Sequence, residues 1–201
     1  MKIICIGRNY LEHAKEMGKH ITKDPIFFLK PDTSLISKKQ PFFLPNFSEN
    51  IHYEAELVYK IKKVGKSIDP VFSKDYYEKV ALGIDFTARD LQAKCKSNGH
   101  PWEIAKSFDQ SALVSEHFFH VNSIKDLNFS LMKNGEIVQK GNANEMVFNI
   151  DQIISYVSKF ITLKIGDLIF TGTPSGVGSV KIGDKLEGFI NDTRVFSLNI
   201  K

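Results

Sequence analysis

Alternation of apolar and polar residues over positions 51–61 is the feature that most constrains the fold of this chain. Successive side chains of a β-strand point to opposite faces, so a period of two indicates a strand whose two faces differ. The apolar face of this predicted strand carries Ala55, Leu57, Tyr59 and Ile61, and the other face carries His52, Glu54 and Glu56. The pattern predicts a fold built around β-sheet.

Glu54 and Glu56 would project from one face of this strand, about 7 Å apart at their Cα atoms. Two ionised carboxylates this close repel each other, and the arrangement is costly unless a cation offsets it. If the strand lies in the interior, a divalent metal meets this need, and all-oxygen ligation favours Mg²⁺ or Mn²⁺ over zinc. The alternative is a solvent-exposed polar strand face, for which such alternation is routine.

A third carboxylate, Asp85, ends an apolar run over residues 80–85 and precedes a predicted helix over residues 88–96. A strand-to-helix junction is a common position for a ligand, but Asp85 would equally serve as the N-cap of that helix, as would Thr87. Three carboxylates around one divalent ion leave a net charge of about −1, so an anionic substrate would need basic groups nearby. The candidates are Arg8, Lys30 and Lys106. Spacing alone does not distinguish them from solvated surface charges.

Local patterns predict the other elements of a single β-rich α+β domain over residues 1–201. Extended segments are expected over residues 2–6 and 25–30, and helices over residues 9–17, ended by Gly18, and 150–160, capped by Asn149 or Asp151. Asn134-Gly135 predicts a type I′ hairpin. Lys164-Ile-Gly-Asp167 and Lys181-Ile-Gly-Asp184 predict two similar turns.

Composition excludes several classes of protein. The formal net charge is only +4, with 27 basic and 23 acidic residues interleaved, so a nucleic-acid surface is not expected. No apolar run approaches the ~20 residues that span a bilayer, and the apolar N-terminal stretch is too short for a signal peptide. Cys5 and Cys95 fit no metal or redox spacing. We therefore expect a cytoplasmic protein without a membrane or nucleic-acid partner.

Several segments, taken together, resemble the fumarylacetoacetate hydrolase family and its small acylpyruvase and oxaloacetate decarboxylase-like members. The matching strings are Ile6-Gly-Arg-Asn-Tyr10, Phe28-Leu-Lys-Pro31, His52-Tyr-Glu-Ala-Glu-Leu57, Gly83-Ile-Asp-Phe-Thr-Ala-Arg-Asp-Leu-Gln92, Pro101-Trp, Ala105-Lys-Ser-Phe108, Ile153-Ile-Ser-Tyr-Val-Ser158 and Gly166-Asp-Leu-Ile-Phe-Thr-Gly-Thr-Pro-Ser-Gly-Val-Gly178. Any one string is weak evidence, but they occur in the family's order across nearly the whole chain. The chain has no room for the N-terminal SH3-like domain of the larger members, which argues against fumarylacetoacetate itself as substrate.

The resemblance implies a fold and a set of site residues. The implied fold is a mixed β-roll or sandwich core with a short N-terminal lid helix, assembled as a homodimer. Mg²⁺ or Mn²⁺ would be held by Glu54, Glu56 and Asp85. The lid would carry a His13–Glu16 pair, and Lys106 would hold the substrate carboxylate or a developing oxyanion. The implied substrate contacts are Arg8, Gln92, Lys106 and Thr173.

The same resemblance implies hydrolysis of the C–C bond of acylpyruvates, small anionic 2-oxo acids. His13 and Glu16, three residues apart on one helix face, would activate water, and the metal would stabilise the pyruvate enolate that leaves. Spacing alone favours an ordinary surface pair. The same enolate would arise if oxaloacetate lost CO₂ or interchanged its keto and enol forms, so decarboxylase, tautomerase and 2-hydroxymuconate-type isomerase activities are alternatives.

Readings from other classes are weaker. A serine hydrolase would need G-x-S-x-G, and the segment Gly172-Thr-Pro-Ser175-Gly has the wrong spacing. No Gly-Lys-Ser/Thr follows the glycine-rich stretch, so it is not a P-loop. His52 is either a metal ligand or a partner of one. A non-catalytic protein with a structural metal site would keep the three carboxylates but would have no use for the lid pair.

Overall fold

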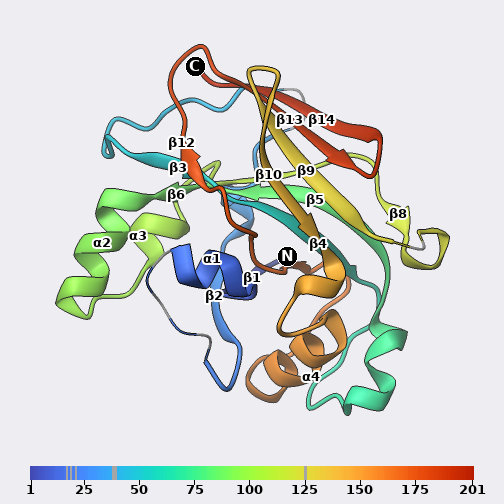
Figure 1. The fold of residues 1–201 in the computed structure, drawn as a ribbon. Helices are drawn as coiled ribbons and strands as arrows, with labels where there is room; N and C mark the ends of the chain where they lie inside the picture. The colour runs from blue at the N-terminus through green and yellow to red at the C-terminus, as the bar shows by residue number, and fades with distance from the viewer. Residues whose placement is uncertain (17, 19, 21, 38–39, 125) are drawn as a thin grey trace.

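The computed structural model describes residues 1–201 except 17, 19, 21, 38, 39 and 125 (Figure 1). Its seven-stranded sheet runs in the order β2 (Ile26–Lys30), β1 (Ile3–Gly7), β11 (Leu168–Phe170), β4 (Ala55–Ile61), β5 (Tyr77–Asp85) and β7 (Ala112–Val114), with β8 (Phe119–His120) also paired to β5. The four-stranded sheet is β10 (Glu136–Asn142), β9 (Asn128–Lys133), β13 (Lys185–Ile190) and β14 (Thr193–Asn199). A three-stranded sheet joins β12 (Gly178–Ser179), β3 (Ile51–Tyr53) and β6 (Thr87–Ala88).

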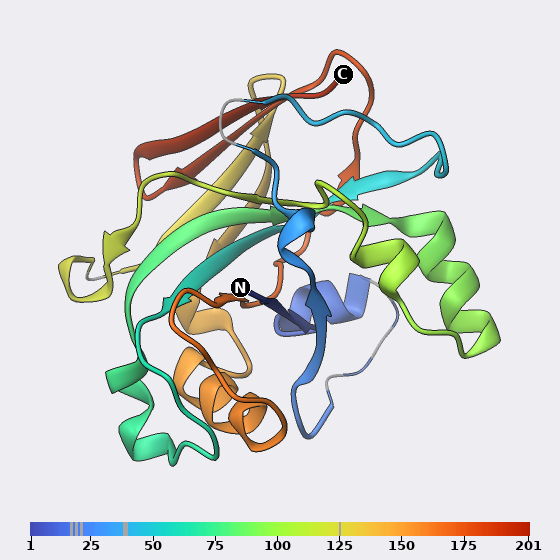
Figure 2. The same cartoon turned by 180° about the vertical axis from the view of Figure 1, so that it is seen from behind.

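Helices cover the outside of these sheets. They are α1 (Leu11–Glu16), α2 (Arg89–Asn98), α3 (Glu103–Lys106) and α4 (Ile150–Phe160), with 3₁₀ turns at Asp32–Ser34, Pro70–Tyr76, Val121–Ser123 and Ala143–Glu145. Both views show α2 and α3 together on one side and α4 at the lower end, with α1 lying between them (Figure 1, Figure 2). The β-rich α+β fold predicted from the sequence is confirmed. None of the helices that the structure describes is both long and apolar enough to cross a bilayer.

The main core lies between the seven-stranded and four-stranded sheets. Leu57 and Leu82 from the first sheet and Leu131 and Leu186 from the second are fully buried in one apolar cluster. The opposite face of the larger sheet is also covered, because Val58 is buried in a second cluster. Both faces of the central strand β4 are therefore interior, which decides the environment of any polar side chain on it.

The predicted strand over residues 51–61 is two strands, β3 and β4, which separate at Glu54. β3 pairs with β6 and β12, whereas β4 pairs with β5 and β11. Hydrophobic alternation does not reveal this break because the chain stays extended while it changes partners. The apolar face is confirmed, but the opposite face is not solvated: Glu54 is 5% exposed and Glu56 is 2% exposed.

Two helix boundaries differ from those predicted. The first helix begins at Leu11 and not at residue 9. Asn9 is taken up by tertiary contacts, since its side chain donates to the carbonyls of Phe148 and Thr171 and accepts from the Phe148 N–H. Met17, the predicted last residue, lies outside the described residues. The helix after Asp85 begins at Arg89 and ends at Asn98, before Gly99 in the left-handed region.

The turns that depend only on local chemistry are confirmed. Asn134 and Gly135 both have positive φ and join β9 to β10. Asn149 caps α4, in a capping box with Gln152. In the two Lys-Ile-Gly-Asp turns the aspartate side chain accepts from the lysine N–H three residues earlier, at 2.7 Å for Asp167 and 2.9 Å for Asp184.

Gly83 should tolerate no side chain, because β5 packs closely on both sides there. A Cβ would lie 2.6 Å from the Leu113 carbonyl oxygen and 2.7 Å from side-chain carbons of Val58 and Phe170. Gly83→Ala should lower the free energy of unfolding in urea by about 1–3 kcal/mol. Gly7→Ala, whose Cβ would meet only the Ile26 oxygen at 3.9 Å, is the control. Equal stability of the two variants would contradict the packing described.

Candidate metal centre and substrate cavity

Strand pairing brings the three predicted carboxylates together. Glu54 stands at the β3–β4 break, Glu56 follows on β4, and Asp85 ends β5, whose residue Ile84 pairs with Ala55. One ligand oxygen from each of the three lies within 4.8 Å of the others, and all three side chains are buried. Asp85 is not an N-cap, since Ala88 occupies that position without a side-chain hydrogen bond.

Three cations pair with two of these carboxylates. Lys106 on α3 donates to Glu54 and Asp85, both at 2.7 Å, and to the Thr87 hydroxyl at 2.6 Å. Lys30 on β2 lies 2.8 Å from Asp85 Oδ1, and Arg89 on α2 lies 2.6 Å from Glu54 Oε1. Burial raises the pKa of Glu54, but the charges of Lys106 and Arg89 outweigh it and hold that pKa well below its usual range.

Glu56 is the carboxylate left uncompensated. Among the described residues no cation lies within ion-pair distance of it, and its one strong contact is the Gly172 N–H, 2.6 Å from Oε2. Burial, together with the charges of Asp85 and Glu54, raises the pKa of Glu56 well above its usual value. A buried carboxylate beside two others needs a proton or a cation. The oxygen-only donor set and this unmet charge fit a hard divalent ion such as Mg²⁺ or Mn²⁺.

A cavity of about 60 Å³ opens above the carboxylates. Its polar wall comprises Arg8, His13, Arg89, Gln92, Lys96, Lys106 and Thr173, and its apolar wall includes Phe28 and Trp102. Arg8 follows β1 with a φ of 58°, in the left-handed region that non-glycine residues rarely adopt. The structure therefore brings the predicted substrate contacts Arg8, Gln92 and Thr173 to one cavity.

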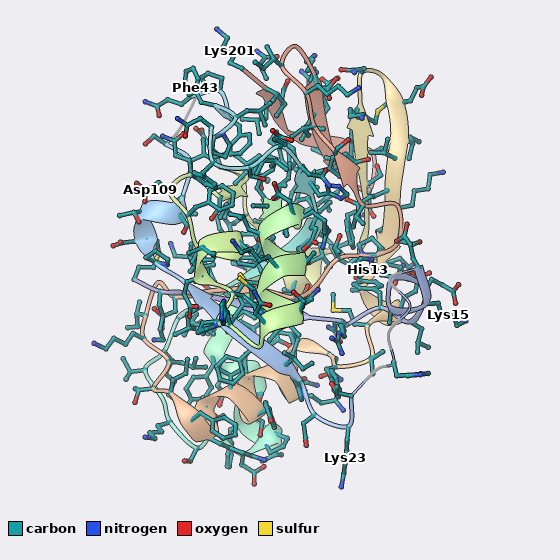
Figure 3. The ribbon with its side chains drawn as sticks, turned by 90° about the vertical axis from the view of Figure 1, so that its left-hand side faces the viewer. His13, Lys15, Lys23, Phe43, Asp109 and Lys201 are labelled. Carbon is teal, nitrogen blue, oxygen red and sulfur yellow. The ribbon has the colours of Figure 1, made fainter. Side chains whose placement is uncertain are left out.

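The lid pair spans the edge of this cavity. Figure 3 shows His13 on the side of α1 that faces the body of the protein, whereas Lys15 points outward. His13 Nδ1 lies 3.3 Å from Glu16 Oε2, and its side chain is 10% exposed. Glu16 lies outside the cavity lining, where both its oxygens accept from the Gly176 N–H at 3.3 Å. Glu16 thus orients His13 and anchors α1 to the segment after Thr173.

Two sequence-based expectations need correction. Lys30 is not available to a substrate: it is 1% exposed, donates to the Ser111 hydroxyl and carbonyl, and forms an ion pair with Asp85. His52 is neither a ligand nor a partner of one among the described residues, since its Nε2 lies 2.9 Å from Oδ1 of Asn50, two residues earlier in the chain. Lys106 does line the cavity, but its three donors are already committed to the protein.

Two basic groups of the site were not predicted. Arg89 pairs with Glu54 and donates to Gln92 at 2.8 Å, and Lys96 lies at the cavity wall over the Trp102 ring, 5.4 Å from its centroid. Positions 89, 92 and 96 follow the i, i+3, i+7 spacing of one helix face. Because Gln92 was already a predicted substrate contact, this spacing could have identified Arg89 and Lys96 as further residues of the site.

The fold and its carboxylate-floored cavity define a strand-rich α+β protein with a site suited to a divalent ion and a small polar ligand. The sequence profile described as Fumarylacetoacetate (FAA) hydrolase C-terminal matches residues 2–201. The chain belongs to the fumarylacetoacetate hydrolase family, and the resemblance seen in its motifs is confirmed.

Individual relatives are enzymes of more than one activity. The chain is 43% identical to the mitochondrial oxaloacetate tautomerase of Mus musculus, over 99% of this chain and 91% of that protein. It is also 43% identical to the mitochondrial oxaloacetate decarboxylase of Dictyostelium discoideum, over 92% and 87%. The crystal structure of fumarylpyruvate hydrolase from Pseudomonas aeruginosa with Mn²⁺ and pyruvate superposes with a TM-score of 0.92 at 34% identity, covering 100% of this chain and 89% of that one.

These comparisons confirm the family and the fold, but not one activity. The tautomerase and decarboxylase relatives are described as mitochondrial, so the cytoplasmic location predicted here stays a prediction. The predicted homodimer also stays a prediction. The roles of the nine predicted site residues likewise rest on geometry and on the family resemblance.

The charge distribution predicts opposite stability effects for two similar substitutions. In EDTA, Glu56→Gln should leave the melting temperature unchanged or raise it, because it replaces a carboxyl group whose ionised form is disfavoured by burial and by the charges of Asp85 and Glu54. Glu54→Gln should lower it, because Lys106 and Arg89 lose a charged partner. Both variants should bind Mn²⁺ at least about tenfold more weakly by calorimetry. Parallel shifts in melting temperature, or unchanged Mn²⁺ affinity in Glu56→Gln, would contradict the assignment.

Proposed function

We propose that the chain is a divalent-metal-dependent enzyme that interconverts the keto and enol forms of a short 2-oxo dicarboxylic acid, with oxaloacetate as its type substrate. The observation that carries the proposal is the cavity itself, in which a carboxylate floor faces a wall of basic groups beneath His13. The tautomerase and decarboxylase relatives support this choice of substrate.

Charge balance supports a dianionic substrate. The floor carries three acidic groups, and the cations in contact with it, among the residues whose placement is described, are Lys30, Lys106 and Arg89. The net charge of about −1 expected from the sequence counted the carboxylates and the metal alone. With these cations included, the protein part of the site is close to neutral when its groups are ionised. A divalent ion held by Glu54, Glu56 and Asp85 would then make the site positive, which favours a ligand with two negative charges. Arg8 and Lys96 provide further positive charge at the wall.

His13 is the group placed to move a proton. Its Nδ1 faces Glu16, which leaves Nε2 as the ring nitrogen able to meet a substrate. In the keto acid, C3 lies between the C2 carbonyl and the distal carboxylate. His13 removes one C3 proton, and a proton returned to the oxygen on C2 completes the enol. A bound Mg²⁺ or Mn²⁺ would supply Lewis-acid stabilisation of the negative charge that develops during this transfer.

Related reactions use different parts of the same site. Decarboxylation of oxaloacetate breaks the C3–C4 bond and needs no proton removal from C3, so His13 has little part in its bond-breaking step. Hydrolysis of acylpyruvates is the second candidate, supported by the His13–Glu16 contact and by the fumarylpyruvate hydrolase neighbour. There His13 would take the proton of an attacking water.

His13→Ala separates these reactions. The variant should lose about 10²-fold or more in kcat/KM for oxaloacetate tautomerisation, the usual contribution of a general base. Its decarboxylation rate should stay near that of the wild type. EDTA should abolish every activity of the wild type, and Mg²⁺ should restore it. The proposal fails if the metal-loaded wild type does not tautomerise oxaloacetate, and the role of His13 fails if tautomerisation and decarboxylation decline equally.

Lys96 should select substrates with a distal carboxylate. Lys96→Met should raise KM about tenfold for oxaloacetate, the loss expected for one charge-assisted contact, and much less for acetylpyruvate, whose distal end is neutral. Equal effects on both substrates would exclude this role.

The same lysine predicts a pH dependence. Desolvation of the ammonium first, and then the charges of Arg89, Lys106 and Arg8, lower the pKa of Lys96 to about 8, against an opposing effect of Glu54. Because the ammonium loses its charge as pH rises, kcat/KM for oxaloacetate should decline through about pH 8 in the wild type. Lys96→Arg, whose guanidinium stays charged, should move that decline to higher pH. An unmoved decline would assign it to another group.

A further inference from the structure

A β-bulge in the second sheet places one glutamine against the site. β10 pairs with β9 in antiparallel register, with Ile137 opposite Met132. The next residue of β9, Leu131, is opposite Gln139 and not Val138. Val138 is the extra residue. Cross-strand partners share a face, and Leu131 faces the core, so the bulge turns Gln139 inward where simple alternation would place Val138. Gln139 is 2% exposed.

All three hydrogen bonds of the Gln139 side chain go to the site. Oε1 accepts from the Ala55 N–H at 3.0 Å, while Nε2 donates to Thr173 Oγ1 at 2.8 Å and to the Pro174 carbonyl at 3.0 Å. The Ala55 N–H can only donate and the Pro174 carbonyl can only accept, so these partners fix which end of the amide is oxygen.

Two of these three partners, Ala55 and Thr173, belong to different halves of the proposed site. Ala55 lies between Glu54 and Glu56, at the point where the chain passes from β3 to β4. The Gln139 amide therefore accepts from a backbone N–H at the β3–β4 break, where a neighbouring strand would otherwise do so. The two carboxylates that flank this N–H are those of Glu54 and Glu56. Thr173 belongs to the cavity wall. It lies on the segment after β11 and directly follows Gly172, whose N–H donates to Glu56.

The bulge also supports the lid contact. Gly176 packs so closely over it that a Cβ would lie 2.2 Å from the Val138 carbonyl oxygen, and Gly176 has a φ of 93°. The N–H of Gly176 is the donor to Glu16, the partner of His13. The bulge at Val138 and Gln139 thus contacts the Ala55 backbone, Thr173 of the cavity wall, and Gly176, which bonds Glu16 of α1.

We propose that Gln139 is a positioning residue that couples the geometry of the Glu54–Glu56 metal centre to that of the Thr173 substrate wall. This proposal rests on the proposed metal-dependent function. Gln139 touches no reacting atom. It acts by fixing the Ala55 backbone and the Thr173 hydroxyl relative to each other, so that a ligand held by the carboxylates meets the wall in one register.

Gln139→Met, which keeps side-chain length but no hydrogen-bonding ends, is the direct test. Mn²⁺ affinity by calorimetry, measured without substrate, should weaken about tenfold or more, the usual effect of removing a group that orients metal ligands. At saturating Mn²⁺, kcat/KM should also fall. The control is Ser158→Ala, which removes a buried hydroxyl bonded to the Ile68 N–H at 2.9 Å and the Ser155 carbonyl at 2.9 Å, away from the cavity.

The outcomes are distinct. If Gln139→Met and Ser158→Ala both lower the melting temperature but only Gln139→Met weakens Mn²⁺ binding, the positioning role is supported. If Gln139→Met keeps wild-type Mn²⁺ affinity and kcat/KM, the proposal is overturned. A wild type that binds Mn²⁺ but turns over no 2-oxo acid would defeat the proposed function and leave the Mn²⁺ measurement on Gln139 intact.

A second pair of variants tests the coupling if Gln139→Met does not fold. Thr173→Val removes the hydroxyl that accepts from Gln139, whereas Thr173→Ser keeps it. Thr173 is outside the carboxylate cluster, so weaker Mn²⁺ binding in Thr173→Val, restored in Thr173→Ser, would show transmission through Gln139. Equal Mn²⁺ affinities in the two variants would overturn the coupling.

Discussion

Burial of three carboxylates at one point of the sheet is the constraint on which the rest of this structure depends. Isolated ionised carboxylates cannot be taken from water without compensation, and buried ion pairs are tolerated only with close, well-oriented partners. The chain meets that cost by directing Lys30, Lys106 and Arg89 to the same point from β2, α3 and α2. The placement of those elements around the end of β5 follows from this charge compensation as much as from apolar packing.

The negative charges of the three carboxylates are not all compensated by the protein, and this difference indicates where a metal ion would bind. Glu54 and Asp85 have protein cations, whereas within the part of the chain that the structure describes Glu56 is bonded by a backbone N–H alone, so Glu56 marks where a further positive charge belongs. The groups that complete the site come from elsewhere: His13 from the lid, Thr173 from the segment after β11, and Gln139 from the second sheet. Chemistry at the carboxylates and recognition at the wall therefore depend on how the two sheets pack.

The sequence predicted what local chemistry determines. Asn134-Gly135, Asn149 and the two Lys-Ile-Gly-Asp turns form as predicted because each is decided within a few residues. The family motifs named Arg8, His13, Gln92 and Thr173 of the cavity wall, but not Arg89 or Lys96. Alternation did not predict the β3–β4 break or the bulge at Val138, because both depend on which strand lies alongside. Nor did it predict that Lys30 lies behind Asp85 and not in the cavity, since that contact joins β2 to the end of β5.

The most direct test of this account is the anomalous scattering of Mn²⁺ in crystals of the protein grown or soaked in MnCl₂. One strong anomalous peak is expected within coordination distance of carboxylate oxygens from Glu54, Glu56 and Asp85, facing the cavity below His13. A peak elsewhere, or no peak while Lys106 still joins Glu54 to Asp85 and Glu56 remains beside its backbone donor, would show that these carboxylates form a structural ion-pair cluster and not a metal centre.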